Sequence, residues 1–300
     1  MSEGKNAVSQ TQRERLAYIE LRVFFVGEVR RPDIEARFGI KPAAASRDLT
    51  AYKELAPDNL EYDTLARCYR PTPKFVPHFG FSPERIMSWL RNGFGDGLDT
   101  RSKSPAQCVG PVTLCVPSLD ILATITRAIC GKRPLRISYL SVSSGKADRE
   151  IVPVALADTG LRWHVRAFDR RNGRFSDFAL RRIVRAEPGS DPVADEESLA
   201  ADEQWARMVD MELVPHPRAA WHEGIAVDYD MVEGVLRVKT RAALAGYFLR
   251  RWNVDCSPEH VLDPAEHHLW LRNQETLYGV ESAALAPGRG NTEQEKKGID

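Results

Sequence analysis

The residues best suited to bind a ligand lie between positions 132 and 185, where the sequence contains thirteen basic residues and only five acidic ones. This surplus of eight positive charges is local, because the whole chain has 42 basic and 42 acidic side chains and a formal charge of zero. Arginine guanidinium groups bind oxyanions in a bidentate manner. A small module with such a surplus is therefore suited to bind an anion.

Short β-strands must position these cations. Apolar and polar residues alternate in residues 136–140, 161–168 and 174–180, a pattern that predicts strands. Successive side chains of a strand point to opposite faces, which puts His164 and Arg166 on one face and Trp163 and Val165 on the other. We therefore expect Trp163 in the core. The candidate ligand-binding residues are Ser138, Tyr139, His164, Arg166, Arg181 and Arg182.

Each of these candidates also has a purely structural interpretation. Tyr139 can stack on a base, whereas His164 is equally well explained as a hydrogen-bonded residue inside a barrel. Arg182 can bind an oxyanion or hold the barrel together through hydrogen bonds to the backbone. The sequence leaves these alternatives open.

The N-terminal region has the pattern of a helix-turn-helix. Helices are expected over residues 13–26, 33–38 and 42 to about 55, with Pro32 at the start of the second helix and Gly39 at its end. Small residues at the start of the third helix would allow it to enter a major groove, and hydroxyl and basic groups follow them. Its candidate DNA-binding residues are Ala43, Ala44, Ser46, Arg47, Thr50 and Lys53, while Leu49 and Tyr52 are expected on the buried side.

Two short strands follow the third helix. Residues 60–63 and 67–70 flank a tight turn and would form the wing of a winged helix, with Arg67 and Arg70 able to contact phosphate. The alternative is that any small three-helix bundle can produce this pattern. The wing makes the DNA-binding interpretation more specific than an isolated helix-turn-helix.

Composition divides the chain into further parts. We expect a DNA-binding domain over residues 1–92, a linker over 93–117, the basic β module with a leading helix over 118–190, a C-terminal module over 191–286 and a disordered tail over 287–300. Residues 187–212 contain nine acidic residues and one arginine, and we interpret this segment as a linker that leaves the basic module. The C-terminal module combines expected strands at 211–214, 234–238 and 268–271 with an amphipathic helix at 241–252, which indicates a small α+β unit. Its aromatic residues Trp221, Tyr247 and Trp252 suit a subunit contact, although a place in the core is the stronger expectation for each.

Several classes of protein are disfavoured. No apolar run approaches the roughly 20 residues of a membrane-spanning helix, and the polar N-terminus does not resemble a secretion signal. The five cysteines are scattered without metal-ligand spacing and suit reduced thiols of a cytoplasmic protein. No nucleophile, general base and oxyanion site are assembled, and the glycines at residues 93–97 complete no nucleotide-binding motif. We expect no enzyme activity, no metal and no cofactor.

Four segments of the basic module carry a family resemblance. Ile137-Ser138-Tyr139, Arg149 to Pro153, Trp163 to Asp169 and Phe175 to Ile183 resemble successive strands of the WYL-domain transcriptional regulators. The sequence departs from the family signature at His164, where the name-giving tyrosine would stand, and at Val165, which replaces leucine.

With this departure, the segment Ser46 to Leu49 and the wing, the chain resembles the BrxR and CapW repressors. These repressors are found beside bacterial anti-phage systems such as BREX and CBASS. The resemblance covers residues 12–280. It implies an α+β multidomain chain with a winged helix-turn-helix, an Sm/SH3-like β-barrel (the WYL domain) and a C-terminal dimerisation module. It further implies a nucleoid-associated homodimer that binds an inverted repeat and represses a defence operon. A nucleotide, an oligonucleotide or another anionic effector would bind at the barrel and release the repressor from its operator. The alternative is an RNA- or oligonucleotide-binding accessory protein that uses the basic barrel as its main surface.

Overall fold

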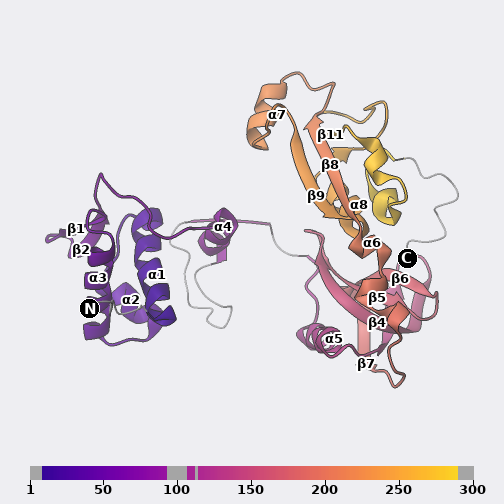
Figure 1. Cartoon of the computed structure of the whole chain (residues 1–300), viewed down its shortest axis with the longest axis horizontal. Coiled ribbons are helices and arrows are strands. Elements are labelled where there is room, and N and C mark those ends of the chain that lie inside the picture. The colour runs from indigo at the N-terminus through magenta and orange to yellow at the C-terminus, as the bar shows by residue number, and fades with distance from the viewer. Residues whose placement is uncertain (1–8, 93–106, 112–113, 290–300) are drawn as a thin grey trace, which may run out of the picture. The chain divides into compact units, whose positions relative to one another are not determined.

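The computed structural model describes residues 9–92, 107–111 and 114–289, which belong to two compact units, Met1–Val112 and Thr113–Asp300 (Figure 1). Most of the linker expected over 93–117 and of the tail expected over 287–300 lies outside the described residues. Within the described ranges, no helix is long and apolar enough to cross a membrane.

The first unit contains a bundle of three helices, a two-stranded wing and a fourth helix, α4. It consists of α1 (Gln10–Val26), α2 (Arg31–Phe38), α3 (Pro42–Leu55), β1 (Leu60–Asp63), β2 (Cys68–Pro71) and α4 (Pro83–Asn92). Local signals set the boundaries, since Ser9 caps α1 and Gly39 ends α2 in the left-handed conformation, with φ of 62°. Buried residues of the three helices form one core, in which Leu49 and Tyr52 lie on the buried side of α3 as predicted.

The second unit begins with α5 (Leu119–Gly131), which packs on a five-stranded antiparallel sheet. The strands are β3 (Leu135–Ser141), β4 (Gly145–Asp158), β5 (Trp163–Asp169), β6 (Arg174–Ala179) and β7 (Ile183–Pro188), in the spatial order β6-β5-β4-β3-β7. The 3-10 helix η1 (Leu180–Arg182) connects β6 to β7, and the described strand pairs do not join these two outer strands. The expected closed Sm/SH3-like barrel is therefore not confirmed.

Trp163 corrects the sequence interpretation. The side chain was expected in the core, yet it is 40% exposed. Trp163 is the first residue of β5 and pairs with Asp158, the last residue of β4, so it lies at the end of both strands. Alternation predicts a face of the sheet but not how far the core extends along a strand.

The C-terminal part of the second unit contains a four-stranded sheet and three helices. Its strands are β8 (Met208–Pro215), β9 (Leu236–Arg241), β10 (Val254–Asp255) and β11 (Leu269–Leu271), in the order β10-β11-β8-β9, and its helices are α6 (Glu203–Ala206), α7 (His222–Asp228) and α8 (Ala242–Arg251). The short 3-10 helices are η2 (Asp195–Glu197), η3 (Leu199–Ala201), η4 (Gln274–Leu277) and η5 (Glu281–Leu285). This arrangement agrees with the small α+β module expected from the sequence.

Helix α8 lies at the centre of this part. A Cβ atom at Gly246 would lie 1.6 Å from the carbonyl oxygen of Ser282, so glycine allows η5 to approach the helix closely. The Ser282 hydroxyl donates to the Ala242 carbonyl at 2.7 Å and accepts from the Gly246 amide at 3.0 Å. Trp221 and Trp252, for which a core position was expected, are exposed instead, because they lie just before α7 and just after α8.

Candidate DNA-binding and ligand-binding sites

One face of α3 presents the side chains that the sequence proposes for DNA. Five of them are exposed, at helical spacings of three and four residues, and Ala44 beside them is half-buried. The exposed residues are Ala43, Ser46, Arg47, Thr50 and Lys53. The helix therefore offers a narrow stripe with small side chains at its start and cations further along, as a major-groove helix requires.

The opposite face of α3 is fixed by two polar contacts. Asp48 is buried and binds the Arg15 guanidinium of α1 in a bidentate pair, with N–O distances of 2.6 and 3.2 Å. The Tyr52 hydroxyl donates to the buried Glu20 carboxylate at 2.7 Å, and burial raises the pKa of Tyr52 well above its usual range. These contacts hold the orientation of α3, so the exposed stripe is positioned before any DNA binds.

The wing adds two exposed cations. Arg67 occupies the turn between β1 and β2 in the left-handed conformation, with φ of 52°, and Arg70 lies on β2. Arg70 forms an exposed ion pair with Asp63, at 3.5 Å. The Lys53 Nζ atom lies 6.0 Å from the centre of the Tyr69 ring, so the end of α3 and the wing belong to one surface.

A cavity of about 650 Å³ lies between the five-stranded sheet and the C-terminal end of α8; we call it the sheet–α8 cavity. It brings together two of the six predicted ligand-binding residues, His164 and Arg182. The other lining residues are Ser141, Val142, Ser143, Thr159, Leu161, Arg162, Tyr247, Arg250, Arg251, Asn253 and Leu285.

The electrostatics of the sheet–α8 cavity favour an anion. Four arginines line it without a carboxylate among the lining residues, and none of the four forms an ion pair within the described parts of the chain. They are Arg162, Arg182, Arg250 and Arg251. Guanidinium groups that lack a carboxylate remain available to a phosphate or another oxyanion.

His164 contributes a neutral acceptor or donor to this cavity. Burial, together with the positive charges of Arg162 and Arg182, lowers the pKa of His164 to about 4. Its ring centre lies 5.1 Å from that of Tyr247, and its Nδ1 atom is buried without a hydrogen-bond partner in the described structure. An uncharged imidazole beside four cations adds hydrogen bonding without adding repulsion.

The other four predicted residues do not reach the sheet–α8 cavity. Tyr139 is only 2% exposed, and its hydroxyl accepts from the Ala179 amide at 3.2 Å, so it cannot stack on a ligand from its place in the core. Ser138 is also buried, with no partner for its hydroxyl among the described residues, and Arg181 is exposed away from the cavity lining. Arg166 is buried in ion pairs with Asp202 at 2.7 Å and Asp177 at 3.3 Å.

The acidic segment 187–212 corrects a second interpretation. It was expected to be a linker, yet it contains η2, η3 and α6 and contacts the sheet through buried carboxylates. Asp202 binds Arg166 and caps α6 by accepting from the Trp205 amide at 3.1 Å, and Glu197 binds Arg170 at 2.6 Å. Part of the local charge surplus is thus neutralised within the chain.

The three other arginines of the sheet–α8 cavity and Tyr247 were not among the predicted ligand-binding residues. Arg162 lies within the strand expected over 161–168, just before the observed start of β5, and Tyr247, Arg250 and Arg251 come from α8, some 85 residues along the chain. The Arg250-Arg251 pair at the end of an amphipathic helix was the available signal, but nothing in the sequence indicates that α8 packs beside β5. The described residues contain no group of three or more potential metal ligands.

Comparison with known proteins identifies all three regions. Residues 11–92 match the model of the BrxR transcriptional regulator winged helix-turn-helix domain, 120–188 match the WYL domain, and 208–277 match the BrxR C-terminal dimerization domain. The DNA-binding transcriptional repressor CapW of Escherichia coli strain KTE188 is 33% identical over 288 residues, which cover 92% of this chain and 94% of the relative. Repressors of the same name from Stenotrophomonas maltophilia (32% identity, 92% and 94% coverage) and Pseudomonas aeruginosa (34%, 85% and 87%) are similarly related.

Proposed function

The chain belongs to the BrxR/CapW family of DNA-binding transcriptional repressors with a WYL domain, and we propose that it represses a phage-defence operon and is released by an anionic effector. In this proposal a homodimer places two copies of α3 in successive major grooves of an inverted repeat. Ser46 and Arg47 help to read the sequence, while Lys53, Arg67 and Arg70 contact phosphates. The operon is of the BREX or CBASS type.

The sheet–α8 cavity carries the effector part of the proposal. The single observation behind it is the presence of four arginines without carboxylate partners in the described structure around the neutral His164. The ligand is therefore an anion that also hydrogen-bonds to an imidazole, a description that fits a nucleotide, an oligonucleotide or another phosphorylated compound.

A buried network links this cavity to the C-terminal module. Tyr247 of the cavity lies beside Asp177, which pairs with Arg166, and Arg166 pairs with Asp202 at the start of α6. An effector that contacts both the sheet and α8 favours one arrangement of the five-stranded sheet relative to the C-terminal module over others. Such a difference in affinity between arrangements is what allows a ligand to change the affinity for the operator.

The test of DNA binding is a salt-titrated gel shift on the DNA upstream of the protein's own gene, with unrelated DNA as competitor. We expect a discrete shift that survives competition and weakens steeply with salt, because bound phosphates release counterions. Arg47→Ala should abolish specific binding while dimerisation persists, and Arg85→Ala, which changes an exposed arginine on α4, should not. Specific binding by Arg47→Ala would show that α3 is not the reading helix.

The test of the effector site uses the same operator in a reporter strain. His164→Ala or Arg182→Ala should still repress but should no longer respond when the defence system is induced by infection. A normal response in both variants would remove the sheet–α8 cavity from sensing.

A second candidate function is favoured by the same unpaired arginines: an accessory protein that binds RNA or oligonucleotides through the basic sheet. DNA and RNA binding by wild type and Arg47→Ala distinguish the repressor from the accessory protein. Loss of duplex DNA binding in Arg47→Ala supports the repressor. Strong binding of RNA by wild type, with only weak and non-specific binding of duplex DNA, supports the accessory protein.

A further inference from the structure

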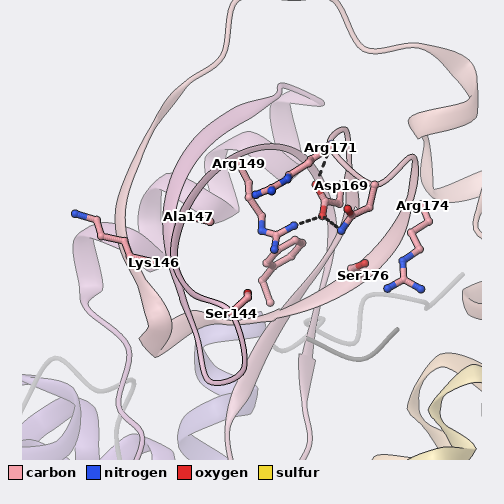
Figure 2. Close-up of a pocket in the computed structure, with 10 residues that line it drawn as sticks. Ser144, Lys146, Ala147, Arg149, Asp169, Arg171, Arg174 and Ser176 are labelled. Carbon is pink, nitrogen blue, oxygen red and sulfur yellow. Dashed lines mark hydrogen bonds and ion pairs between the residues drawn. The ribbon is translucent and has the colours of Figure 1, made fainter. Parts of the chain in front are cut away.

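A second hollow lies on the five-stranded sheet, beside the β3–β4 turn and the β5–β6 turn (Figure 2). We call it the β5–β6 hollow; its volume is about 550 Å³. It is lined by Ser144, Lys146, Ala147, Arg149, Asp169, Arg171, Asn172, Arg174, Ser176 and Phe178. None of these residues lines the sheet–α8 cavity, so the two sites can be altered independently.

The only carboxylate that lines the β5–β6 hollow is already engaged within the protein. Asp169 is fully buried and accepts from the Arg149 guanidinium and the Asn172 amide, each at 2.8 Å, and from the Arg171 backbone amide at 3.0 Å. These bonds fix the β5–β6 turn and hold Arg149 in place. The other charged side chains among the lining residues are the cations Lys146, Arg149, Arg171 and Arg174.

Arg149 has an unused donor inside this site. Its side chain is only 9% exposed, and its Nε atom is buried without a hydrogen-bond partner in the described structure. An unsatisfied buried donor on a charged group is costly unless a ligand or water binds it. Figure 2 shows the side chains of Arg149 and Arg171 close together near Asp169, so a second guanidinium group lies beside the unused donor.

We propose that the β5–β6 hollow is a second anion site, which binds adjacent phosphate groups of a nucleotide or of an oligonucleotide. Arg149 is pre-oriented by Asp169 and provides a buried donor, while the exposed Arg171 contacts the ligand from the rim. A volume of about 550 Å³ exceeds the needs of a single phosphate and suits at least two. This site is separate from the effector cavity and does not depend on that assignment.

Titration calorimetry of the full-length protein with inorganic pyrophosphate tests the proposal. We expect two sites per chain in the wild type. Arg171→Ala should weaken binding about tenfold at the β5–β6 hollow alone, Arg182→Ala about tenfold at the sheet–α8 cavity alone, and the double variant should weaken both sites. Arg171→Ala leaves the fold intact, because only its backbone amide bonds to Asp169. Arg185→Ala is the matched control: it removes an exposed β7 arginine outside both sites and should retain two.

Arg149→Lys gives an independent readout, because it keeps the charge and removes the guanidinium fork. We expect about tenfold weaker binding at this site alone, as for the loss of one charge-assisted hydrogen bond. Identical binding by wild type, Arg171→Ala and Arg149→Lys overturns the second site. If Arg182→Ala loses all pyrophosphate binding, the β5–β6 hollow is not a site and the sheet–α8 cavity is supported. If only Arg171→Ala loses binding, the β5–β6 hollow is supported and the sheet–α8 cavity is not a site.

The source of the phosphates is identified by repeating the titration with ADP and with a single-stranded DNA of five nucleotides. Sensitivity to Arg171→Ala with ADP assigns the site to a nucleotide, and sensitivity with the DNA alone assigns it to a nucleic-acid backbone. If Arg171→Ala changes the binding of neither ADP nor the DNA, although wild type binds pyrophosphate at two sites, the hollow binds inorganic anions only. This result would overturn the proposed ligand class.

Discussion

Two sets of arginines on the same sheet have opposite surroundings. Arg166 and Arg170 bind Asp202 and Glu197 of the acidic segment, at 2.7 and 2.6 Å. Arg162 and Arg182 face the sheet–α8 cavity without a carboxylate partner in the described structure, together with Arg250 and Arg251 of α8. The first set attaches the C-terminal module to the sheet, and the second leaves positive charge for a ligand.

A local charge surplus therefore does not by itself indicate a ligand site. The cost of burying Arg166 is offset by two carboxylates and several hydrogen bonds, and its pKa is raised well above the usual range by Asp202 and Asp177 despite burial. Among the described residues, no carboxylate pairs with the arginines of the cavity. An anion bound in the cavity would provide the missing negative charge.

The largest effect is expected from breaking the first set. Asp202→Asn keeps the shape and the capping ability of the side chain but leaves Arg166 with Asp177 alone. Removal of one partner from a buried ion pair costs about 3–5 kcal/mol, so we expect a loss of this order in the free energy of unfolding, measured by urea denaturation of the whole chain.

Asp191→Asn is the matched control, because Asp191 is 71% exposed and lies 3.9 Å from Arg170. Exposed pairs of this kind contribute at most about 1 kcal/mol. Similar stabilities of the two variants would show that the acidic segment does not hold the module in place.

A smaller effect is expected from changing the second set. Arg182→Ala should weaken pyrophosphate binding at the sheet–α8 cavity by about tenfold, which corresponds to about 1.4 kcal/mol, because one charge-assisted contact is lost. The free energy of unfolding of this variant should stay within about 0.5 kcal/mol of wild type, since Arg182 forms no ion pair in the described part of the chain. A large loss of stability with unchanged anion affinity would place Arg182 with the structural arginines and would remove the contrast.

The elements of the fold were predictable because their signals are local. The helix boundaries near Gly39 and Pro42 and the wing at residues 60–71 follow from capping, proline and turn chemistry within a few neighbouring residues. The exposed stripe of α3 follows from helical spacing alone. Its role in binding DNA stays a prediction until Arg47 is tested.

The ligand site was only partly predictable because its composition depends on contacts between distant segments. Alternation placed His164 and Arg166 on one face correctly, but only the folded chain shows that Asp202 occupies Arg166 and that α8 completes the cavity beside His164. The same limit explains Tyr139 and the acidic segment. The sequence shows which side chains are charged, but it does not show which of them form ion pairs in the folded chain.

His164 provides the smallest and most specific test of the contrast. Its pKa of about 4 lies below the value of about 6.5 expected in the unfolded chain, because of burial and of the charges of Arg162 and Arg182. The unfolded state therefore takes up a proton first as the pH falls, so this contribution to stability is complete above pH 6.5 and is lost progressively toward pH 4. Between pH 8 and pH 6 the loss should be about 1 kcal/mol in wild type relative to His164→Gln.

Urea denaturation at both pH values measures this difference, with the exposed His222→Gln as control. Asp158 partly offsets the two arginines, and Tyr247 packs against the ring without a charge. An anion in the sheet–α8 cavity should raise the pKa of His164, because it neutralises Arg162 and Arg182. Saturating pyrophosphate should therefore reduce the difference between wild type and His164→Gln; an unchanged difference at full occupancy would mean that the anion binds away from these arginines.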